Sequence, residues 1–340
     1  MSALLSVDNL TVRYPLSRGL GEILSGAPRR AIRAVERVSL TLERGETLGL
    51  VGESGCGKST LGRALLRLTA AEAGSVRFDG VEVLALEGPQ LLAFRRRAQM
   101  IFQDPFASLN PRRTVGATLS EVLHVHKICP AAEIDRKITR LMDIVGLPQE
   151  LRGRRPGALS GGQCQRVGLA RALAVAPELI ISDESVSALD VSIQAQILNL
   201  FMRLKSEMNL TMIFISHDLG VVRHLCHRVA VMYLGRIVEV GATDEIFASP
   251  RHPYTRALLK AIPQMAPDAT LAAAPVAGEP PSPIAVPPGC AYHPRCPQAM
   301  ADCRSGASPG LRPAGEAAVA CHLYDGTRGD APSGDVPAAM

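Results

Sequence analysis

The chain has 340 residues, and its 37 Lys plus Arg against 32 Asp plus Glu give a formal net charge of +5. Its 47% hydrophobic and 20% charged residues exclude wholesale disorder and suffice for a sizeable core. The mild positive charge permits a patch for phosphate, RNA or anionic lipid without requiring one. Five Tyr, seven Phe and no Trp argue against a stacked aromatic surface for single-stranded nucleic acid.

The lack of a signal-peptide pattern and of a membrane-spanning run predicts the compartment of the chain. The N-terminal residues show no basic stretch followed by an apolar one, and no run of about 18 apolar residues occurs. We therefore expect a chain of the reducing cytoplasm that neither is secreted nor spans a bilayer. In that compartment the eight cysteines are expected to be thiols or metal ligands rather than disulfides.

Strand and helix patterns alternate before residue 250. Strands are expected at 47–51, 100–102, 179–182, 212–216 and 229–233, and helices beginning near Lys58, Gly162, Val191 and Asp218. This alternation predicts an α/β layered core. Residues 15–33 show little periodicity and are expected to form a surface loop, whereas helical periodicity from about 104 to 160 predicts a helical insertion.

Proline divides the chain. Sixteen of the 25 prolines lie from Pro250 onward, so we divide the chain into a domain at 1–255 and an extension at 256–340. The Ala- and Pro-rich extension is expected to be extended, with polyproline character rather than a packed core. No internal repeat is visible.

The strongest motif has the form G-x-x-x-x-G-K-[ST], follows an expected strand and opens an expected helix. In this context glycines let backbone N–H groups point at a phosphate, and the helix N-terminus adds partial positive charge. Lys58 would neutralise the β- and γ-phosphates of a nucleotide, and Ser59 would place its hydroxyl on Mg²⁺. The predicted ATP-binding residues of this P-loop are Gly52, Glu53, Ser54, Gly55, Cys56, Gly57, Lys58, Ser59 and Thr60.

An acidic pair ends the apolar strand at 179–182. Asp183 could hold Mg²⁺, usually through water, and Glu184 could orient and polarise a water for attack on the γ-phosphate. The alternative interpretation is a solvated acidic turn, which the neighbouring P-loop disfavours.

The run Leu159-Ser160-Gly161-Gly162-Gln163 precedes the acidic pair, and residues 187–190 follow it and end in Asp190. These motifs are similar to the signature and the D-loop of the ABC (ATP-binding cassette) ATPases, a family with a P-loop NTPase fold. Tyr14 stands where an aromatic ring stacks on adenine, Gln103 matches the Q-loop, and His217 matches the switch histidine. Without the other motifs, a lone histidine after a strand would more often be structural.

The resemblance implies that two cassettes enclose two ATP molecules. Each site then pairs one P-loop with the partner's signature, so Ser160, Gly161, Gly162 and Gln163 would act on the partner's ATP. The helix that starts in this signature presents N–H groups suited to an anion. By the same resemblance, the catalytic set is Glu184, His217 and Gln103, and the Mg²⁺ ligands are Ser59, Gln103 and Asp183.

Two positions depart from the family pattern. Ser185 follows Glu184 where many relatives have Pro, and Ser182 precedes Asp183 where an apolar residue or Cys is common. Both could alter how rigidly Glu184 is held. Cys56 and Cys164 occupy positions that vary in the family, and we assign neither thiol a chemical role.

Finer motifs lie at residues 100–112, 187–196 and 252–259. They resemble the ATPases of oligopeptide/dipeptide importers, most closely the second of the two ATPase subunits. The resemblance implies a fold with a mixed β core, a helical insertion and a proline- and cysteine-rich tail. It also implies a peripheral location on the cytoplasmic face of the membrane, and no nucleic-acid partner. The implied partners are a second, homologous ATPase, two permeases that contact residues 106–114, and an extracytoplasmic binding protein.

Four tail cysteines, Cys290, Cys296, Cys303 and Cys321, lie within 32 residues in the spacing C-x5-C-x6-C-x17-C. This is neither a zinc-ribbon nor a ferredoxin pattern. A thiolate-bound metal could staple a tail that lacks a core, and some relatives are thought to hold a [4Fe–4S] cluster there. Zinc, with His293 or His322, and uncommitted thiols remain alternatives; Cys129 and Cys226 are expected to pack in the core.

Three functions therefore compete. We predict the first, an ATPase subunit that couples ATP binding and hydrolysis to the uptake of peptides by an importer. The same ATPase type serving another substrate, such as a metal chelate or glutathione, is its alternative. The second, a soluble ABC ATPase of translation or DNA repair, would favour tandem cassettes or a long coiled coil. The third, an adaptor that binds ATP without turnover, would favour loss of Glu184 or His217, and both are present.

Overall fold

The computed structural model describes residues 3–18, 30–185, 190–261 and 278–325. Its strands are β1 (Leu5–Pro15), β2 (Ala31–Leu42), β3 (Thr47–Val51), β4 (Ala73–Phe78), β5 (Val81–Glu82), β6 (Ala98–Ile101), β7 (Leu179–Asp183), β8 (Thr211–Ile215), β9 (Arg228–Tyr233), β10 (Arg236–Ala242), β11 (Arg312–Ala314) and β12 (Ala317–Val319).

Ten α-helices and five 3₁₀ turns lie within the described ranges. The helices are α2 (Lys58–Leu65), α3 (Gly88–Arg97), α4 (Val115–Val125), α5 (Ile134–Ile144), α6 (Gly161–Leu173), α7 (Val191–Met208), α8 (Leu219–Leu225), α9 (Thr243–Ala248), α10 (Pro253–Lys260) and the one-turn α11 (Ala301–Ser305), which follows the nine longer ones. The 3₁₀ turns are η1 (Ala131–Glu133), η2 (Gln149–Gly153), η3 (Pro156–Ala158), η4 (His293–Arg295) and η5 (His322–Tyr324).

The central sheet has eight strands in the order β11-β12-β10-β9-β3-β8-β7-β6. From β9 to β6 neighbouring strands are parallel, whereas β10, β12 and β11 pair antiparallel. The predicted α/β class with a mixed β core is therefore confirmed. The parallel strands share one carboxyl edge, and a ligand site is expected at that edge.

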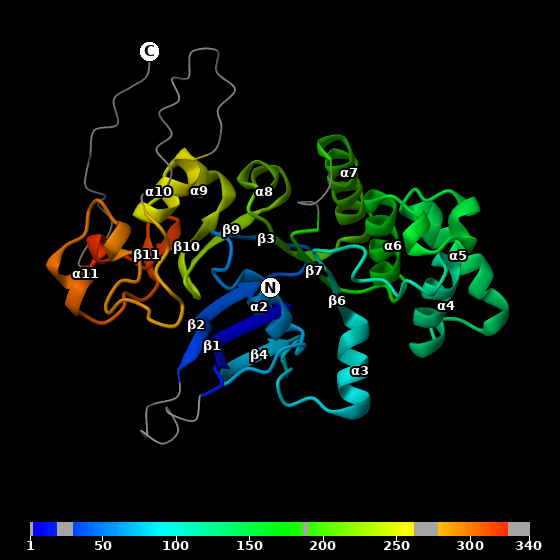
Figure 1. Cartoon of the computed structure of the whole chain (residues 1–340), viewed down its shortest axis with the longest axis horizontal. Helices are drawn as coiled ribbons and strands as arrows, with labels where there is room; N and C mark the ends of the chain where they lie inside the picture. The colour runs from blue at the N-terminus through cyan, green and yellow to red at the C-terminus, as the bar shows by residue number, and fades with distance from the viewer. Residues whose placement is uncertain (1–2, 19–29, 186–189, 262–277, 326–340) are drawn as a thin grey trace, which may run out of the picture.

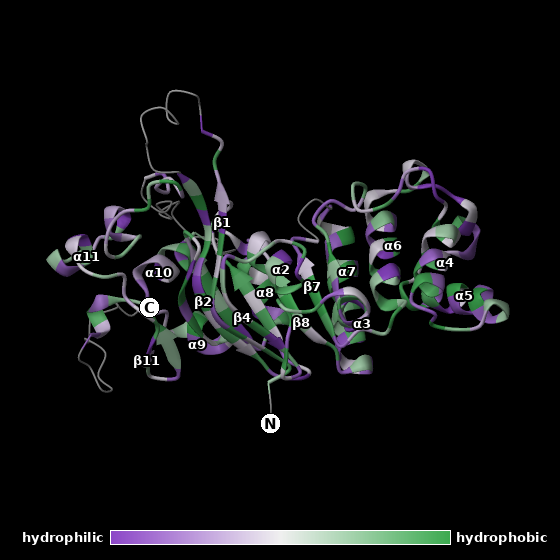
Figure 2. Cartoon of the chain, turned by 90° about the horizontal axis from the view of Figure 1, so that it is seen from below, coloured by the Kyte–Doolittle hydropathy of each residue, from purple (hydrophilic) through white to green (hydrophobic). Residues whose placement is uncertain are grey.

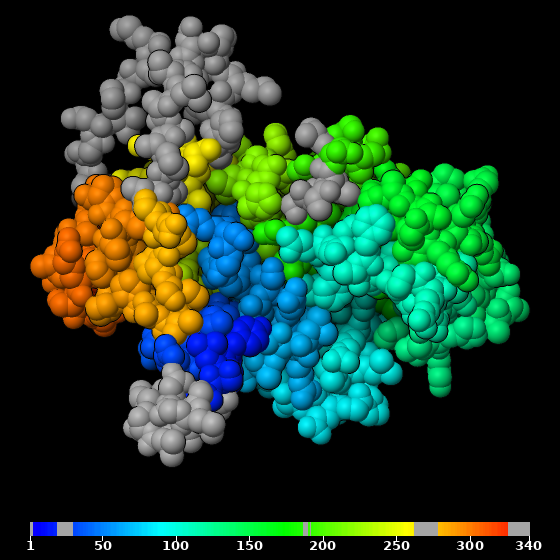
Figure 3. Space-filling model, in the orientation of Figure 1, coloured from blue at the N-terminus to red at the C-terminus, as the bar shows by residue number. Residues whose placement is uncertain are grey.

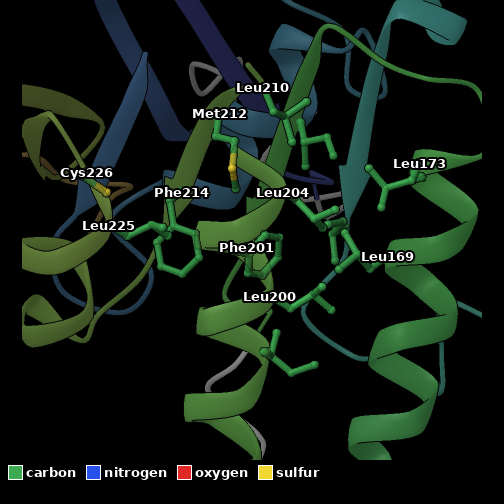
Figure 4. Close-up of a cluster of buried hydrophobic side chains, with 14 of the residues drawn as sticks. Leu169, Leu173, Leu200, Phe201, Leu204, Leu210, Met212, Phe214, Leu225 and Cys226 are labelled. Atoms are coloured by element: carbon green, nitrogen blue, oxygen red, sulfur yellow. The ribbon is translucent and has the colours of Figure 1, made fainter. Parts of the chain in front are cut away.

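Both faces of this sheet are covered, because successive side chains of its strands point to opposite sides. In β8, Met212 and Phe214 join a core with helices α6, α7 and α8, while Ile213 and Ile215 join a core on the other face. Figure 4 shows Phe201 and Leu204 of α7 against Met212 and Phe214 of β8. Strands buried on both faces explain the continuous apolar runs of the sequence.

The second face is covered by α2 and an antiparallel sheet of order β2-β1-β4-β5. Figure 1 shows β1, β2 and β4 below β3 and β9, and Figure 2 shows hydrophobic residues concentrated between these layers. The predicted surface loop at 15–33 is too long at both ends, because β1 runs to Pro15 and β2 starts at Ala31; residues 19–29 lie outside the described residues.

The predicted helical insertion contains α4 and α5, which pack beside α6. Ile138, Leu141 and Met142 line the buried stripe of α5. Figure 1 places α4 and α5 at one end of the molecule, and α11 and β11 at the other. No helix of the described ranges is long and apolar enough to cross a membrane.

The tail departs from its prediction. Described residues 278–325 pack against the core instead of running extended: β12 pairs with β10, and Tyr292, Val319 and Tyr324 are buried. Prolines do not prevent this, because Pro313 lies in β11, at the edge of the sheet, where a missing N–H costs no ladder bond. The boundary at 255/256 falls inside α10, and residues 262–277 lie outside the described residues.

Candidate functional site

The P-loop joins β3 to α2 and needs glycine at two close approaches. Gly52 and Gly57 have φ of 151° and 109°, and a Cβ on them would lie 2.1 Å from the carbonyl oxygen of Met232 and 2.0 Å from that of Ala34. Lys58 is buried, and its Nζ donates to the carbonyl oxygens of Gly52 (2.8 Å) and Glu53 (3.0 Å). The loop thus curls around the lysine, with the α2 N-terminus at its end.

Asp183 lies at the carboxyl end of β7, directly beside the start of α2. The Ser59 hydroxyl donates to its Oδ1 at 2.6 Å, while its buried Oδ2 has no hydrogen-bond partner and lies 3.9 Å from Arg63. Burial raises the pKa of Asp183 against the opposing effect of the Ser59 hydrogen bond. An orphaned carboxylate oxygen next to a serine hydroxyl fits a Mg²⁺ site with oxygen ligands.

Glu184, Gln103 and His217 converge beside this pair. The Gln103 amide donates to Glu184 Oε2 at 2.9 Å, His217 Nδ1 lies 3.7 Å from the same oxygen, and Lys58 Nζ lies 3.8 Å from Oε1. These side chains come from the ends of β6, β7 and β8 and from the P-loop. The structure therefore brings the predicted catalytic residues together at one edge of the sheet.

Ser182 and Ser185, the two residues expected to depart from the family pattern, contact each other. Ser182 Oγ and Ser185 Oγ form a buried hydrogen bond of 2.6 Å across the turn that carries Glu184. Glu184 itself has φ of +42°, a conformation uncommon for a residue with a side chain. Its N–H donates to the carbonyl of Ile215 at 3.0 Å. The hydroxyl pair thus spans a strained turn.

The predicted signature begins α6. Ser160 Oγ accepts from the Gln163 N–H at 3.3 Å, and Gln163 Oε1 accepts from the Ser160 N–H at 2.9 Å, which makes a reciprocal capping box. A Cβ on Gly162 would lie 2.5 Å from Ile193 of α7, so a small residue lets these helices approach. Among the described residues no hydrogen bond or ion pair joins 160–163 to the P-loop.

Tyr14 and Asp190, the two remaining predicted site residues, are both exposed. Tyr14, in β1, is 39% exposed, which leaves its ring available for stacking. Asp190 is exposed at the start of α7 and its side chain makes no capping hydrogen bond there. The remaining D-loop residues 187–189 lie outside the described residues.

Sequence reasoning missed two residues that hold the P-loop. The Tyr254 hydroxyl accepts from the Glu53 N–H at 2.9 Å, and Arg295 of the tail binds both Glu53 carboxylate oxygens at 2.8 Å. Glu53 therefore points its side chain toward the tail. Tyr254 lies in the run His252-Pro-Tyr254 and Arg295 in the run His293-Pro-Arg295. Neither run has a pattern that indicates contact with a P-loop.

The tail cysteines do not form a ligand set in the structure. No group of three or more His, Cys, Asp or Glu in the described ranges, which include all four cysteines, is placed to hold a metal. Burial, with smaller effects from Cys290, Cys296 and Cys303, raises the pKa of Cys321 to about 12. The predicted iron–sulfur cluster is thus unsupported by the structure. Burial also raises the pKa of Cys164 to about 11 and that of Cys226 to about 12.

Two family models match this chain. The model described as ABC transporter matches residues 35–187, and the one described as Oligopeptide/dipeptide transporter, C-terminal region, matches residues 238–303. The first range contains the P-loop, Gln103, the signature, Asp183 and Glu184. The second contains Tyr254 and Arg295.

Curated relatives of this chain are named for the same kinds of transporter as these family models. The probable peptide ABC transporter ATP-binding protein y4tS of Sinorhizobium fredii is 50% identical over 94% of this chain and 90% of its own length. The di/tripeptide transport ATP-binding protein DppF of Pseudomonas aeruginosa is 46% identical over 95% of this chain and 98% of its own length. The glutathione import ATP-binding protein GsiA of Pectobacterium atrosepticum is 51% identical over 76% of this chain and 41% of its own length.

A solved dimeric structure of the ATP-binding cassette MJ0796 bound to ADP and Pi is similar in fold. It has a TM-score of 0.62 and 26% identity and covers 70% of this chain and 98% of that one. Together with the converging P-loop, acidic pair and signature, these similarities show that the chain belongs to the ATP-binding subunits of oligopeptide/dipeptide-type ABC transporters.

Proposed function

We propose that this chain hydrolyses ATP at the site described above and thereby drives the uptake of peptides. The observation that carries the proposal is the convergence of Lys58, Asp183, Glu184 and His217 at one edge of the sheet. Relatives named for peptide transport and the matching C-terminal family support peptides as cargo. The GsiA relative supports glutathione, itself a small peptide, as the second candidate cargo.

Each residue of the site would have its own role in binding or hydrolysing ATP. Lys58 would exchange its carbonyl partners for the β- and γ-phosphate oxygens, while P-loop N–H groups cradle the nucleotide. Ser59, Asp183 and Gln103 would hold Mg²⁺, which when bound neutralises charge on the phosphates. Glu184 would accept a proton from the attacking water, and His217, near the same carboxylate, would contact the γ-phosphate. Tyr14 would stack on the adenine ring.

The signature suits a second ATPase. Ser160, Gly161, Gly162 and Gln163 begin α6, and the capping box uses the N–H groups of Ser160 and Gln163. The N–H groups of Gly161 and Gly162, which the capping box does not use, can meet a partner's nucleotide. We propose a similar but non-identical ATPase as that partner, with the D-loop and Asp190 at the contact. The dimeric MJ0796 structure supports the pairing of two cassettes.

The helical insertion offers a place for a permease. A hollow of about 390 Å³ lies beside α4 and is lined by Ser108, Asn110, Arg113, Thr118, Glu121, Val122, Val125, His126 and Arg171. Val125 of this lining is exposed, as is Phe106, which precedes Ser108 by two residues. We propose that each of two permeases inserts a helix into such a hollow, that a binding protein delivers the cargo outside, and that this chain lies on the cytoplasmic face of the membrane.

Replacement of the proposed base tests the chemistry. Glu184→Gln keeps the shape of the side chain but cannot accept the proton, so turnover should fall by about 10²-fold or more while ATP still binds. Phosphate release and equilibrium binding of a fluorescent ATP analogue measure the two quantities. Hydrolysis by the variant at the wild-type rate would remove Glu184 from this role.

We keep the [4Fe–4S] cluster as a separate proposal for the tail. Its support is the sequence, which places four cysteines within 32 residues of the tail, whereas the described residues do not bring them together as a ligand set. Anaerobically purified protein should contain iron and sulfide and absorb visible light, and Cys321→Ser should abolish all three. Zinc without iron, or no metal, would reject the cluster.

A further inference from the structure

Arg295 is a buried charge of the tail that lies against the P-loop. Its two terminal nitrogens bind the two carboxylate oxygens of Glu53 at 2.8 Å each, and its side chain is only 5% exposed. The hydrogen bonds to Glu53 raise the pKa of Arg295 above its usual value. Such a bidentate pair fixes both position and orientation, and it joins residues 242 positions apart.

Three tyrosines surround this pair. The rings of Tyr233, Tyr254 and Tyr292 lie 4.6 to 5.3 Å apart, centre to centre, and Arg295 lies over Tyr233 and Tyr292 at 5.9 and 6.0 Å. Tyr233 also accepts a hydrogen bond of 3.4 Å from Arg295. The cluster joins β9, α10 and the tail, and its Tyr254 hydroxyl accepts from the Glu53 N–H. Glu53 is thus held at its backbone and at its side chain.

The tail brings Arg295 to this place by docking on the sheet. β12 pairs with β10 at Val319 and Ala318, and the Cys290 N–H donates to the carbonyl of Cys303 at 3.0 Å. Between them the turn η4 presents Arg295 toward β9. Figure 3 shows the tail, in orange, as a body adjoining the blue strands and the yellow helices.

The position of Glu53 matters for the nucleotide in two ways. Its carbonyl and that of Gly52 hold Lys58 in the loop, so fixing Glu53 fixes the lysine anchors. Its carboxylate, which faces Arg295 of the tail, also places a negative charge beside the loop that must receive a triphosphate. Because charges in a half-buried site are screened less than at the surface, an unpaired carboxylate there would repel the ligand.

We infer that Arg295 is a positioning residue of the ATP site and that the tail thereby completes the P-loop. The guanidinium neutralises Glu53 and pre-organises the loop, so that ATP binding orders less chain and meets less repulsion. This inference rests on the proposed function, because it requires ATP to bind at the P-loop.

Equilibrium titration with a fluorescent ATP analogue, together with kcat and KM, tests the inference on the full chain. Arg295→Ala should raise Kd and KM about tenfold, with kcat at saturating ATP changed far less, as for loss of a close charge pair. Adding Glu53→Gln to Arg295→Ala should recover much of the lost affinity, because the repelling charge is then gone. Arg295→Lys keeps the positive charge but cannot make the two parallel hydrogen bonds of a guanidinium, so its Kd should lie between those of the wild type and Arg295→Ala.

Arg304→Ala is the matched control, since Arg304 is an exposed arginine on the same tail, and its Kd should equal that of the wild type. Should Arg295→Ala fail to fold, Arg295→Gln keeps most of the volume and gives the same comparison. A Kd within twofold of wild type for the folded variant, or a double variant no tighter than the single one, would overturn the inference.

Lys58→Ala separates this inference from the proposed function. If Lys58→Ala abolishes binding and Arg295→Ala does not weaken it, the tail has no role in the site although the P-loop binds ATP. If Lys58→Ala still binds the analogue with wild-type Kd, the proposed P-loop function itself fails.

Discussion

At the scale of single residues, Ser182 and Ser185 flank the acidic pair. Both were expected to depart from the family pattern, and a hydrogen bond of 2.6 Å joins their hydroxyls. Two hydroxyls that satisfy each other can replace an apolar residue and a proline in a buried turn, because neither is left unpaired. The turn also holds Glu184 at positive φ, so its rigidity would bear on the proposed role of Glu184 as the base.

We expect Ser185→Ala to lower the free energy of unfolding by about 1–3 kcal/mol, since it leaves the Ser182 hydroxyl buried without a partner. The double change Ser182→Ala plus Ser185→Ala should cost less than the sum of the two single changes. Urea unfolding of the four proteins measures this coupling. Additive effects would show that the hydroxyls act independently.

At the scale of elements, the sequence predicted the parallel strands and their helices closely. Strand β3 has the predicted bounds, and the other four predicted strands lie within two residues of theirs, because apolar runs between polar turns mark buried strands. The P-loop and acidic pair follow from their places after β3 and β7. The three-residue strands β11 and β12 could not be predicted, since they are too short for a periodicity and depend on β10 for pairing.

The signature helix gives a prediction at the same scale. Ser160→Ala should destabilise the protein by about 1 kcal/mol through loss of the capping box, whereas Ser160→Gly should cost only a few tenths. Thermal or urea unfolding measures both. If the hydroxyl also contacts the partner's ATP, both variants should lower ATPase activity equally in the assembled transporter. Equal destabilisation by Ala and Gly would contradict the capping role.

At the scale of the whole molecule, long-range contacts account for what the sequence did not show. Arg295 and Glu53 stand 242 positions apart, and no local pattern in either segment indicates the other. The same holds for Tyr254 and the P-loop, which are 201 positions apart. Such pairs depend on how the tail packs, and the proline content wrongly predicted that it would not pack.

His252, fully buried under the tail, should give global stability a pH dependence. Burial, with a smaller effect of Arg256, lowers its pKa to about 3, and its neutral Nδ1 accepts from the Tyr254 N–H at 3.0 Å. Between pH 6.5 and pH 3 the unfolded chain binds a proton that the folded chain does not. The free energy of unfolding should therefore fall by about 1.4 kcal/mol for each pH unit lost.

The matched variant is His252→Asn, whose amide oxygen can still cap α10 but does not titrate. From pH 8 to pH 5 the wild type should lose about 2 kcal/mol more than this variant in urea unfolding. Parallel pH profiles for the two proteins would show that folding does not lower the pKa of His252.

The strand pairing of the tail has one more consequence. Without β12, the outer edge of β10 would expose unpaired backbone groups at Glu239 and Val240, where other chains could add as strands. The short β11, with Pro313 and the exposed Arg312, instead ends the sheet in a form that resists such addition. The tail thus protects the cassette against edge-to-edge aggregation, and a chain cut after α10 should precipitate at concentrations at which the whole chain stays dispersed.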